Sequence, residues 1–324
     1  MAKQTANKHM GKFIIAFIVF VAAFWAAFTW WHMSLYAPGP LTESKTIIIE
    51  NGKSSGAIAQ QLEKNDVVRD AFMFRLALRT SLSDRFLKAG EYAFDPKISM
   101  RKVIQKLTGG DVLNRSLTIP EGYSFDQIRA ILMAEEGLSG PPLAFEEGAL
   151  LAETYHFKYG TKRADLMRKM AKEMNAVVNE AWENRATNLP LNSPQELLTL
   201  ASIVEKETAI PSERTVIASV FINRLNKGMR LQADPTVVYG ASDYAGDITY
   251  AHLRENHAYN TYVHKGLPPT PIASPGKEAI FASANPAQTD YLYFVADGTG
   301  KHIFAKTYAE HKKNVAAYLA IQSN

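Results

Sequence analysis

Apolar positions are most concentrated near the N-terminus of the chain. An uncharged run extends from Phe13 to Trp31, which is about the ~20 residues that a membrane-spanning helix requires. We therefore expect a transmembrane anchor over residues 13–36. The alternative is a cleaved signal peptide, but its apolar core is usually about 7–15 residues long and ends in small residues. Here the run ends in Trp30, Trp31 and His32, which favours an uncleaved anchor.

Charged and aromatic residues beside this run predict its orientation. Basic residues precede it, and no further Lys or Arg occurs until Lys45. The preceding basic residues are Lys3, Lys8 and Lys12. Because basic residues favour the cytoplasmic side, residues 1–12 should be cytoplasmic and the remainder external. Tyr36 adds to an interfacial aromatic belt, and the Pro/Gly/Ser stretch 37–44 should form a linker because it cannot continue a helix.

The next pattern along the chain is that of a strand, a turn and a helix. Residues 46–50 (TIIIE) have the composition of a strand, and Gly52 indicates a turn. Ser55 is then expected to cap a helix that carries Ile58 and Leu62 on one face.

A second copy of this pattern occupies residues 116–132, with Gly122 at the turn. Between the copies lie an expected strand over 89–94 and an expected helix over 99–107. We predict that these elements form a small α+β module over residues 45–136. Such modules often bind extended polymers, and a plain spacer domain has the same pattern, so both interpretations stay open.

Helical patterns dominate residues 137–324. Ser193 is expected to cap a helix, with Pro194 at its first position and Glu196 completing a capping box. The other expected elements are a helix over 163–183, a helix from Pro211 that stops at Gly228, a strand over 290–296 and a helix over 308–321. The predicted fold is therefore α+β, with an N-terminal transmembrane helix, the small α+β module and a helix-dominated α+β domain.

The helix that begins at Ser193 ends in an acidic pair. Its sequence LTLASIVEKET covers residues 198–208 and places Glu205 and Glu207 on either side of Lys206. At about 100° per residue both carboxyls border a broad apolar arc, and the larger apolar side chains adjoin Glu207. Burial disfavours the charged form of a carboxyl and raises its pKa toward the range of a general acid at neutral pH.

A purely structural interpretation of the pair is an ion pair between either carboxyl and an arginine. The candidate arginines are Arg214, Arg224 and Arg230. Two segments, 229–240 and 258–276, favour a functional interpretation instead. Both are expected to be loops rich in Asn, Gln, Asp, Thr, Tyr and Pro, a composition suited to a rigid polar groove for sugars. Thr208, next to Glu207, could hydrogen-bond a substrate group or the carboxyl itself.

Composition narrows the chemistry further. The chain of 324 residues has a formal net charge of +4 with scattered Lys and Arg, which argues against a nucleic-acid partner. It has no Cys, which removes disulfides and thiol nucleophiles. His252, His257 and His264 lack the spacing typical of a zinc site, Ser202 lacks a Gly-x-Ser-x-Gly setting, and no Gly-rich phosphate loop occurs. We therefore expect no metal and no cofactor.

Several short motifs carry a resemblance over essentially the whole chain. They are ASIVEKET, FINRL, GMRLQADPTVVYG, YNTY, GLPPTPI, NPA and YLYFVADGTGKHIF. Together they resemble the endolytic murein transglycosylase family, also called YceG-like. The resemblance implies a bacterial inner-membrane enzyme with an N-terminal anchor, a LysM-like module and a periplasmic catalytic domain over residues 137–324. Such an enzyme cuts nascent peptidoglycan strands within the glycan, and the resemblance also suggests association with peptidoglycan synthases.

The catalytic glutamate of the family corresponds to Glu207, the second Glu of the EKET pattern. The resemblance implies that it acts as a single acid and base on the β-1,4 bond between N-acetylmuramic acid and N-acetylglucosamine, leaving a 1,6-anhydro end. Further residues are expected to bind sugars or to support the site. These are Thr208, Glu205, Gln232, Asp234, Tyr239, Asn260, Tyr262 and Tyr155. For Asp234, the alternative is that it caps the turn before Pro235.

One stretch departs from the family pattern. Residues 149–157 (ALLAETYHF) place Ala152 and Glu153 where the family usually has a Pro and an acidic residue, which leaves the local turn open. Two other functions are compatible with the sequence. One is a muramidase, in which water replaces the muramyl 6-hydroxyl, and the other is a non-catalytic, membrane-anchored scaffold that binds peptidoglycan.

Overall fold

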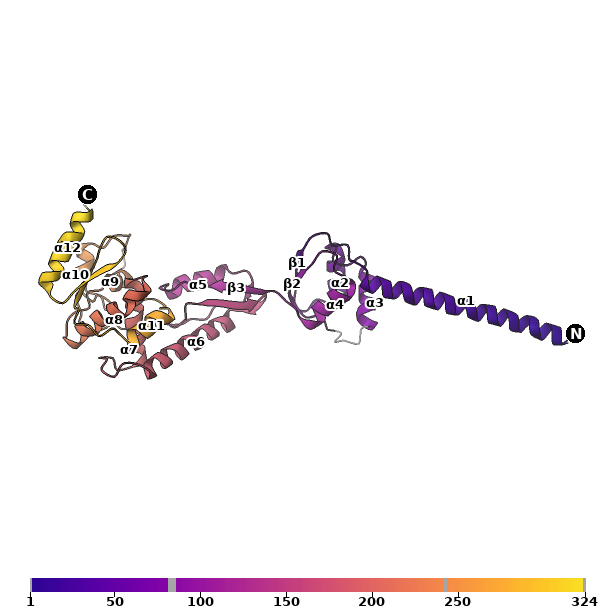
Figure 1. The fold of residues 1–324 in the computed structure, drawn as a ribbon, viewed down its shortest axis with the longest axis horizontal. Helices are drawn as coiled ribbons and strands as arrows, with labels where there is room; N and C mark the ends of the chain where they lie inside the picture. The colour runs from indigo at the N-terminus through magenta and orange to yellow at the C-terminus, as the bar shows by residue number, and fades with distance from the viewer. Residues whose placement is uncertain (1, 81–85, 242–243, 323–324) are drawn as a thin grey trace. The chain divides into compact units, whose positions relative to one another are not determined.

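The computed structural model describes most of the chain, namely residues 2–80, 86–241 and 244–322. Met1 and the side chains of Lys3 and Lys8 in the predicted cytoplasmic tail lie outside the described residues. The first element is a long helix, α1 (Ala2–Tyr36) (Figure 1). Its part from Met10 to Tyr36 is apolar and exposed, and by length and composition it could cross a membrane. The helix expected over residues 13–36 is therefore present.

Contacts divide the chain into two compact units. The first is Met1–Arg115 with Lys158–Gly160, and the second is Ser116–Phe157 with Thr161–Asn324. The division predicted after residue 136 falls inside the second unit. The second copy of the strand, turn and helix groups with the second unit, and the predicted domain boundary stays a prediction.

The first unit packs helices against a small sheet. Its strands β1 (Lys45–Ile49) and β2 (Gly90–Phe94) pair antiparallel. Its helices after α1 are α2 (Ser55–Lys64), α3 (Ala71–Thr80) and α4 (Met100–Gly109). Buried residues from all of these elements form one core, which includes Ile49, Leu62, Phe74, Tyr92 and Leu107.

The start of α2 differs from the expectation by one residue. Ser54, and not Ser55, is the N-cap, because its side chain accepts a hydrogen bond of 3.2 Å from the backbone N–H of Ala57. Ile58 and Leu62 are buried as expected. Ser54 and Ser55 are equally good N-cap candidates in the sequence, and the backbone conformation in the structure shows that Ser54 is the cap.

Short strands belong mostly to the second unit. Strand β3 (Asn114–Thr118) pairs with β5 (Thr154–Lys158). Strand β4 (Leu138–Ser139) pairs in parallel with β6 (Thr161–Lys162). Strand β7 (Tyr293–Ala296) pairs antiparallel with β8 (His302–Ala305). The expected strand over 290–296 is thus shorter than predicted and begins at Tyr293.

Helices make up most of the second unit. They are α5 (Phe125–Ala134), α6 (Arg163–Glu183), α7 (Pro194–Glu207), α8 (Pro211–Asn226), α9 (Asp234–Gly240), α10 (Tyr250–Arg254), α11 (Lys277–Ala284) and α12 (Tyr308–Gln322). The helix expected over 163–183 is confirmed at both ends. The prediction that 229–240 is a loop is wrong from Asp234 onward, because a short helix begins at Asp234 and holds Pro235 in its first turn, where proline is tolerated.

The N-terminus of α7 forms only half of the predicted capping box. The Ser193 hydroxyl accepts the N–H of Glu196 at 3.2 Å, and Pro194 is the first helical residue. The Glu196 carboxylate accepts the N–H of Asn192 at 2.7 Å, one residue before the predicted donor. The helix start is therefore as specified, with a different second partner.

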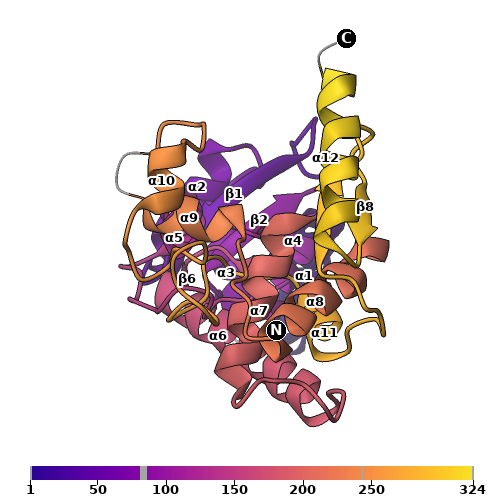
Figure 2. The same ribbon diagram turned by 90° about the vertical axis from the view of Figure 1, so that its left-hand side faces the viewer.

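Helix α7 lies at the centre of the second unit, between α6 and α8 (Figure 2). Every residue from Leu197 to Val204 is buried, so this part is enclosed on all sides and the predicted apolar arc is too narrow a description. Only the last turn emerges, with Lys206 exposed and Glu207 half-buried. The end of a central helix thus brings a carboxyl from the core to the surface.

Candidate active site

The carboxyl end of α7 opens into a pocket of about 310 Å³. Elements far apart in the sequence contribute to its walls, namely α7, α8, the segment that leads into α9, the loop after α10, β7 and α12. The lining residues are Glu207, Arg224, Gln232, Asp234, Tyr262, Tyr293, Phe294, Tyr308 and His311. Polar and aromatic side chains converge here, as in sites that bind small polar ligands.

Glu207 is the last residue of α7 and the acid of this pocket. Burial and, as a smaller cause, the negative charge of Asp234 raise the pKa of its carboxyl to about 8, while Arg224 opposes the shift. The carboxyl is therefore protonated at neutral pH and can donate a proton to a ligand in the pocket. A strongly perturbed carboxyl in a concave site is a physical indication of a catalytic acid.

Asp234 lines the pocket and is held by Tyr262. The Tyr262 hydroxyl donates a hydrogen bond of 2.6 Å to Asp234 Oδ1. Burial, followed by this hydrogen bond, raises the pKa of Tyr262. Asp234 is the first residue of α9 after the N-cap Ala233, which makes no side-chain cap bond. The hydrogen bond from Tyr262 is thus a partner of the Asp234 carboxylate that sequence analysis did not indicate.

Gln232 lines the pocket in an unusual backbone conformation. Its φ is 49°, a left-handed value that is unfavourable for residues other than Gly. Thr261 holds this segment, because its carbonyl accepts the N–H of Gln232 at 3.2 Å and its hydroxyl accepts the N–H of Ala233 at 3.0 Å. The strain directs an exposed amide side chain to the pocket and is typical of functional sites.

Asn260 supports the site from the core and does not line the pocket. Its side chain is fully buried, donates to the carbonyls of His252 and Glu255 at 3.0 and 2.8 Å, and accepts the N–H of Tyr262 at 2.9 Å. Of the two roles expected for Asn260, sugar binding or support, its position fits support. It fixes the loop from which Tyr262 reaches Asp234.

Arg224 supplies a buried positive charge that the predicted set of site residues did not include. Its Nε donates to the carbonyl of Leu292 at 2.7 Å, its guanidinium also donates to the carbonyl of Leu231, and it lies 5.4 Å from the centre of the Tyr293 ring. Arg224 was expected only as an ion-pair partner of the acidic pair. Its bonds to two carbonyls fix the charge at the pocket wall, where it moderates the pKa of Glu207.

The C-terminal wall of the pocket was also missed. The ring of His311 on α12 stacks on Tyr293 with centres 5.1 Å apart, and Tyr308 lines the pocket beside it. Burial, followed by the charge of Arg224, lowers the pKa of His311, so the imidazole is neutral at neutral pH. Its Nδ1 is buried and has no hydrogen-bond partner among the described residues. The YLYFVADGTGKHIF motif contained Tyr293 and Phe294, whereas nothing in the α12 pattern marked His311.

Glu205 turns away from Glu207 and pairs with Arg214, one of the three arginines considered from the sequence. Its carboxylate lies 3.6 Å from the Arg214 guanidinium and accepts the N–H of Gly276 at 2.9 Å. Arg214 also pairs with Glu121 and Glu278. The first carboxyl of the pair thus ties the end of α7 to neighbouring segments, and only the second faces the pocket.

Three other expected site residues lie outside the pocket. Thr208 is buried, accepts the N–H of Ile210 at 3.0 Å and donates to Glu213 at 3.4 Å. Tyr155 belongs to a separate core cluster and donates to the carbonyl of Leu151 at 2.9 Å. Tyr239 donates to a carboxylate oxygen of Glu147 at 3.3 Å. The expectation that Thr208 bonds the Glu207 carboxyl is therefore not met, and Tyr155 packs in the core.

A second hollow, of about 590 Å³, meets the pocket at Asp234, which lines both. Its other walls come from the turn after β3, the last turn of α7 and helix α9. The lining residues are Gly122, Ser124, Gln127, Lys206, Asp234, Pro235, Val238, Tyr239, Tyr244 and Ile272. Tyr239 therefore lines this hollow, and Asp234 is the residue that the two cavities share.

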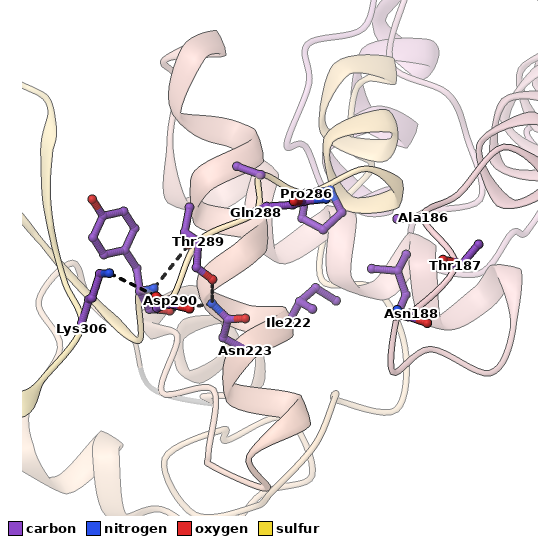
Figure 3. A pocket seen from close by; sticks show the side chains of 13 residues that line it. Ala186, Thr187, Asn188, Ile222, Asn223, Pro286, Gln288, Thr289, Asp290 and Lys306 are labelled. Atoms are coloured by element: carbon purple, nitrogen blue, oxygen red, sulfur yellow. Dashed lines mark hydrogen bonds and ion pairs between the residues drawn. The ribbon is translucent and has the colours of Figure 1, made fainter.

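Figure 3 shows another hollow, of about 640 Å³, between α8 and the segment after α11. It shares no lining residue with the pocket of Glu207. Polar groups around it bind each other: Lys306 pairs with Asp290 at 3.1 Å, and the Asn223 amide donates to the carbonyl of Thr289 at 2.8 Å. The candidate chemistry therefore lies at the pocket of Glu207. Within the described ranges, no group of three or more His, Asp or Glu residues is placed to hold a metal ion.

Comparisons with known proteins agree with the motifs. The model of the YceG-like family matches residues 47–317. The endolytic murein transglycosylase of Bacillus subtilis (strain 168) is 33% identical over 314 residues, which cover 86% of this chain and 86% of that protein. The protein of the same name from Streptococcus pneumoniae serotype 2 (strain D39) is 30% identical and covers 98% of this chain and 67% of that protein.

A solved structure gives the same result. The crystal structure at 2.6 Å of a putative yceG-like protein from Listeria monocytogenes matches with a TM-score of 0.55 at 32% sequence identity. The match covers 84% of this chain and 98% of that one. The chain belongs to the YceG-like family.

Proposed function

We propose that the protein is a membrane-anchored endolytic murein transglycosylase that cleaves the β-1,4 bond between N-acetylmuramic acid and N-acetylglucosamine within glycan strands. The relatives from Bacillus subtilis and Streptococcus pneumoniae carry the name endolytic murein transglycosylase. The observation that supports the proposal most is the carboxyl of Glu207, which lines a pocket with its pKa raised to about 8. Such a carboxyl holds a proton at neutral pH for a departing sugar oxygen.

In the first step, Glu207 gives its proton to O4 of the leaving N-acetylglucosamine as the bond between that oxygen and the muramyl C1 breaks. Positive charge develops on the muramyl ring. Asp234, which lines the same pocket, is a negative group suited to stabilise this charge. Tyr262 holds the Asp234 carboxylate in place with its hydrogen bond of 2.6 Å.

In the second step, Glu207 is a carboxylate and removes the proton of the muramyl 6-hydroxyl while O6 forms a bond to C1. The product is a 1,6-anhydro-muramyl end, and Glu207 regains its proton. No water enters the reaction, so a second carboxylate that activates water, as in inverting glycosidases, is not required. This accounts for a pocket in which one protonated carboxyl is combined with hydrogen-bonding and aromatic groups.

The shape of the site supports a cut within a strand. The pocket of Glu207 and the second hollow share Asp234, and Lys206, next to Glu207, lines the second hollow, so we assign the sugars on the two sides of the scissile bond to these two cavities. We assign sugar contacts to Gln232 and Tyr262 in the first pocket and to Tyr239 in the second hollow. Tyrosine rings and amides suit this role, because sugars offer apolar faces and many hydroxyls.

The N-terminal part suits attachment to the membrane in which these strands are made. Helix α1 is long and apolar enough to span a membrane once, with the N-terminus in the cytoplasm and the catalytic part in the periplasm. We further propose that the module before the catalytic domain is LysM-like and binds peptidoglycan. Peptidoglycan synthases, which make the strands, are proposed partners on the basis of the family resemblance.

The test uses the full chain in detergent or nanodiscs with uncrosslinked glycan strands, and mass spectrometry of the products. We expect 1,6-anhydro-muramyl ends that disappear in Glu207→Gln and persist in Glu196→Gln, a matched change at the other end of α7. Products heavier by one water would identify a muramidase. Binding of strands without new ends in the unsubstituted protein would indicate a scaffold, and activity that persists in Glu207→Gln would overturn the assignment of the acid.

A further inference from the structure

Helix α3 presents an apolar face to solvent that the core of the first unit does not use. Phe74, Ala77 and Leu78 are buried in the core. On the outer side, Phe72 is 68% exposed and Leu76 is 37% exposed. These two residues are four positions apart, so they lie one above the other on the same face of the helix.

Positive charges flank this apolar face. Arg75 and Arg79 are exposed and are also four positions apart, next to Phe72 and Leu76 on the helix surface. The sequence of α3, AFMFRLALRT, contains no acidic residue. Asp70, just before the helix, accepts the N–H of Met73 at 2.7 Å and so serves as a cap. A short helix with exposed aromatic and aliphatic residues and two arginines is typical of segments that lie in a membrane interface.

The position of α3 in the first unit places this face beside the exit of α1. A hollow of about 590 Å³ is lined by the end of α1, including Trp30 and Met33, and by the start of α3, including Met73. Trp30 is 62% exposed and Met33 is 66% exposed. Figure 1 shows α3 on the side of the unit from which α1 extends. Met73 of α3 thus shares a hollow with exposed apolar residues of α1, and Phe72, the first exposed residue of the apolar face, is its neighbour in the chain.

Contacts within the first unit fix this arrangement. Leu35 of α1 packs against the core of the unit, the Arg69 guanidinium donates to the carbonyl of Pro38 at 3.1 Å, and Arg101 lies 5.1 Å from the centre of the Tyr36 ring. The end of α1 is thus bound to the unit on two sides. A membrane that surrounds α1 up to its aromatic belt must also meet the surface of α3.

We propose that α3 is an interfacial helix that binds anionic phospholipid, with Phe72 and Leu76 among the acyl chains and Arg75 and Arg79 on lipid phosphates. The proposal rests on the membrane anchoring proposed above. A lipid surface fits this face better than a protein partner, because the membrane that surrounds the end of α1 would also contact Trp30. Because α3 would contact the bilayer in addition to α1, the first unit would keep one face toward the membrane and would not rotate freely about α1.

The experiment exploits the absence of cysteine from the chain. Leu76→Cys in the full chain provides a single thiol for an environment-sensitive fluorophore and leaves Phe72 in place. Asn51→Cys, in the exposed turn after β1, is the matched control. Both proteins are placed in nanodiscs of phosphatidylethanolamine and phosphatidylglycerol, and the label is quenched either by aqueous iodide or by spin labels on the lipid chains.

We expect the label at position 76 to show blue-shifted emission, several-fold weaker quenching by iodide and several-fold stronger quenching by lipid spin labels than the label at position 51. Equal quenching at the two positions would overturn the proposal. Recovery of the protein with the nanodiscs after flotation tests the anchor separately, so a failure of α1 to anchor is distinguished from a failure of α3 to bind lipid.

A charge reversal tests the recognition of anionic lipid. In the labelled protein, Arg75→Glu should restore quenching by iodide, while Lys64→Glu, an equal charge change on α2, should leave it low. Nanodiscs of phosphatidylcholine alone should give the labelled protein weaker protection than nanodiscs with phosphatidylglycerol. Protection that is independent of both lipid charge and Arg75 would contradict the role of the arginines. Circular dichroism verifies that the variants are folded.

Discussion

The hydroxyl of Tyr262 donates a hydrogen bond of 2.6 Å to the carboxylate of Asp234, and the charge held by this bond raises the pKa of Glu207 across the pocket. The two residues come from different segments, α9 and the loop after α10. Asn260 fixes that loop through three hydrogen bonds of its buried amide. The pKa of the acid therefore depends on its burial first and then on the way in which these two segments are joined.

Removal of the Asp234 charge should change the pH dependence of activity. Burial and Asp234 raise the pKa of Glu207 to about 8, so activity should decline as pH rises through this value. Asp234→Asn removes one cause, and we expect the alkaline limb of the kcat/KM profile to move to lower pH. Asp290→Asn, at the hollow without assigned chemistry, is the control. An unchanged limb in Asp234→Asn would show that this charge does not act on Glu207.

The same pKa has a consequence for stability. Folding raises the pKa of Glu207 from an ordinary 4.5 to about 8, so the folded state binds the proton more tightly and loses stability as pH rises between these values. The loss should be on the order of 1 kcal/mol per pH unit. We expect Glu207→Gln, which carries no ionisable group there, to unfold at higher temperature than the unsubstituted protein at pH 8, with little difference at pH 4.5. Calorimetry at both pH values tests this, and a constant difference would contradict it.

Two tyrosine-to-phenylalanine changes should affect different properties, one the activity and the other the stability of the fold. A hydrogen bond to a charged group contributes about 1.5–3 kcal/mol, so loss of the bond to Asp234 in Tyr262→Phe should lower kcat/KM roughly tenfold or more. Tyr155→Phe loses a bond to the carbonyl of Leu151 in the core and should lower the free energy of unfolding by about 1 kcal/mol without loss of activity. Strand cleavage and chemical denaturation of both variants provide the measurements. Loss of activity in Tyr155→Phe together with full activity in Tyr262→Phe would show that Tyr155, and not Tyr262, supports the site.

The strained backbone at Gln232 should link stability to activity. Gln232 has a φ of 49°, which glycine adopts without the cost of about 1 kcal/mol that other residues bear. Gln232→Gly should therefore stabilise the fold by up to about that amount while activity falls, because the amide in the pocket is lost. Lys97, with a φ of 57°, lies outside the pocket, and Lys97→Gly should raise stability alone. Equal activity in Gln232→Gly and Lys97→Gly would show that the Gln232 side chain does not contact the sugar.

Several elements follow from the sequence because local signals agree. The bounds of α6 coincide with a regular apolar period, and the start of α7 coincides with Ser193 and Pro194. Helix α9 was missed because seven residues starting with Asp-Pro resemble a turn. The division of the chain after Arg115 depends on which neighbours the second strand and helix contact, and a repeated local pattern does not contain that information.

The candidate site shows the same limit. The motifs contained Glu207, Gln232, Asp234 and Tyr262, and the structure brings them to one pocket. Tyr155 was expected there because of its motif, but the nearby carbonyl of Leu151 satisfies its hydroxyl in the core. His311 was missed because α12 presents polar and apolar residues on every side, so the sequence pattern does not indicate which residue faces the pocket.

Helix α12 supplies Tyr308 and His311 to a pocket whose acid lies much earlier in the chain. Ribosomes build the chain from its N-terminus, so Glu207 is synthesised before the last wall of its pocket exists. A chain still being synthesised thus carries the acid without its complete surroundings. In the proposed topology, the order of synthesis delays the assembly of the active site until nearly all of the protein has reached the periplasm.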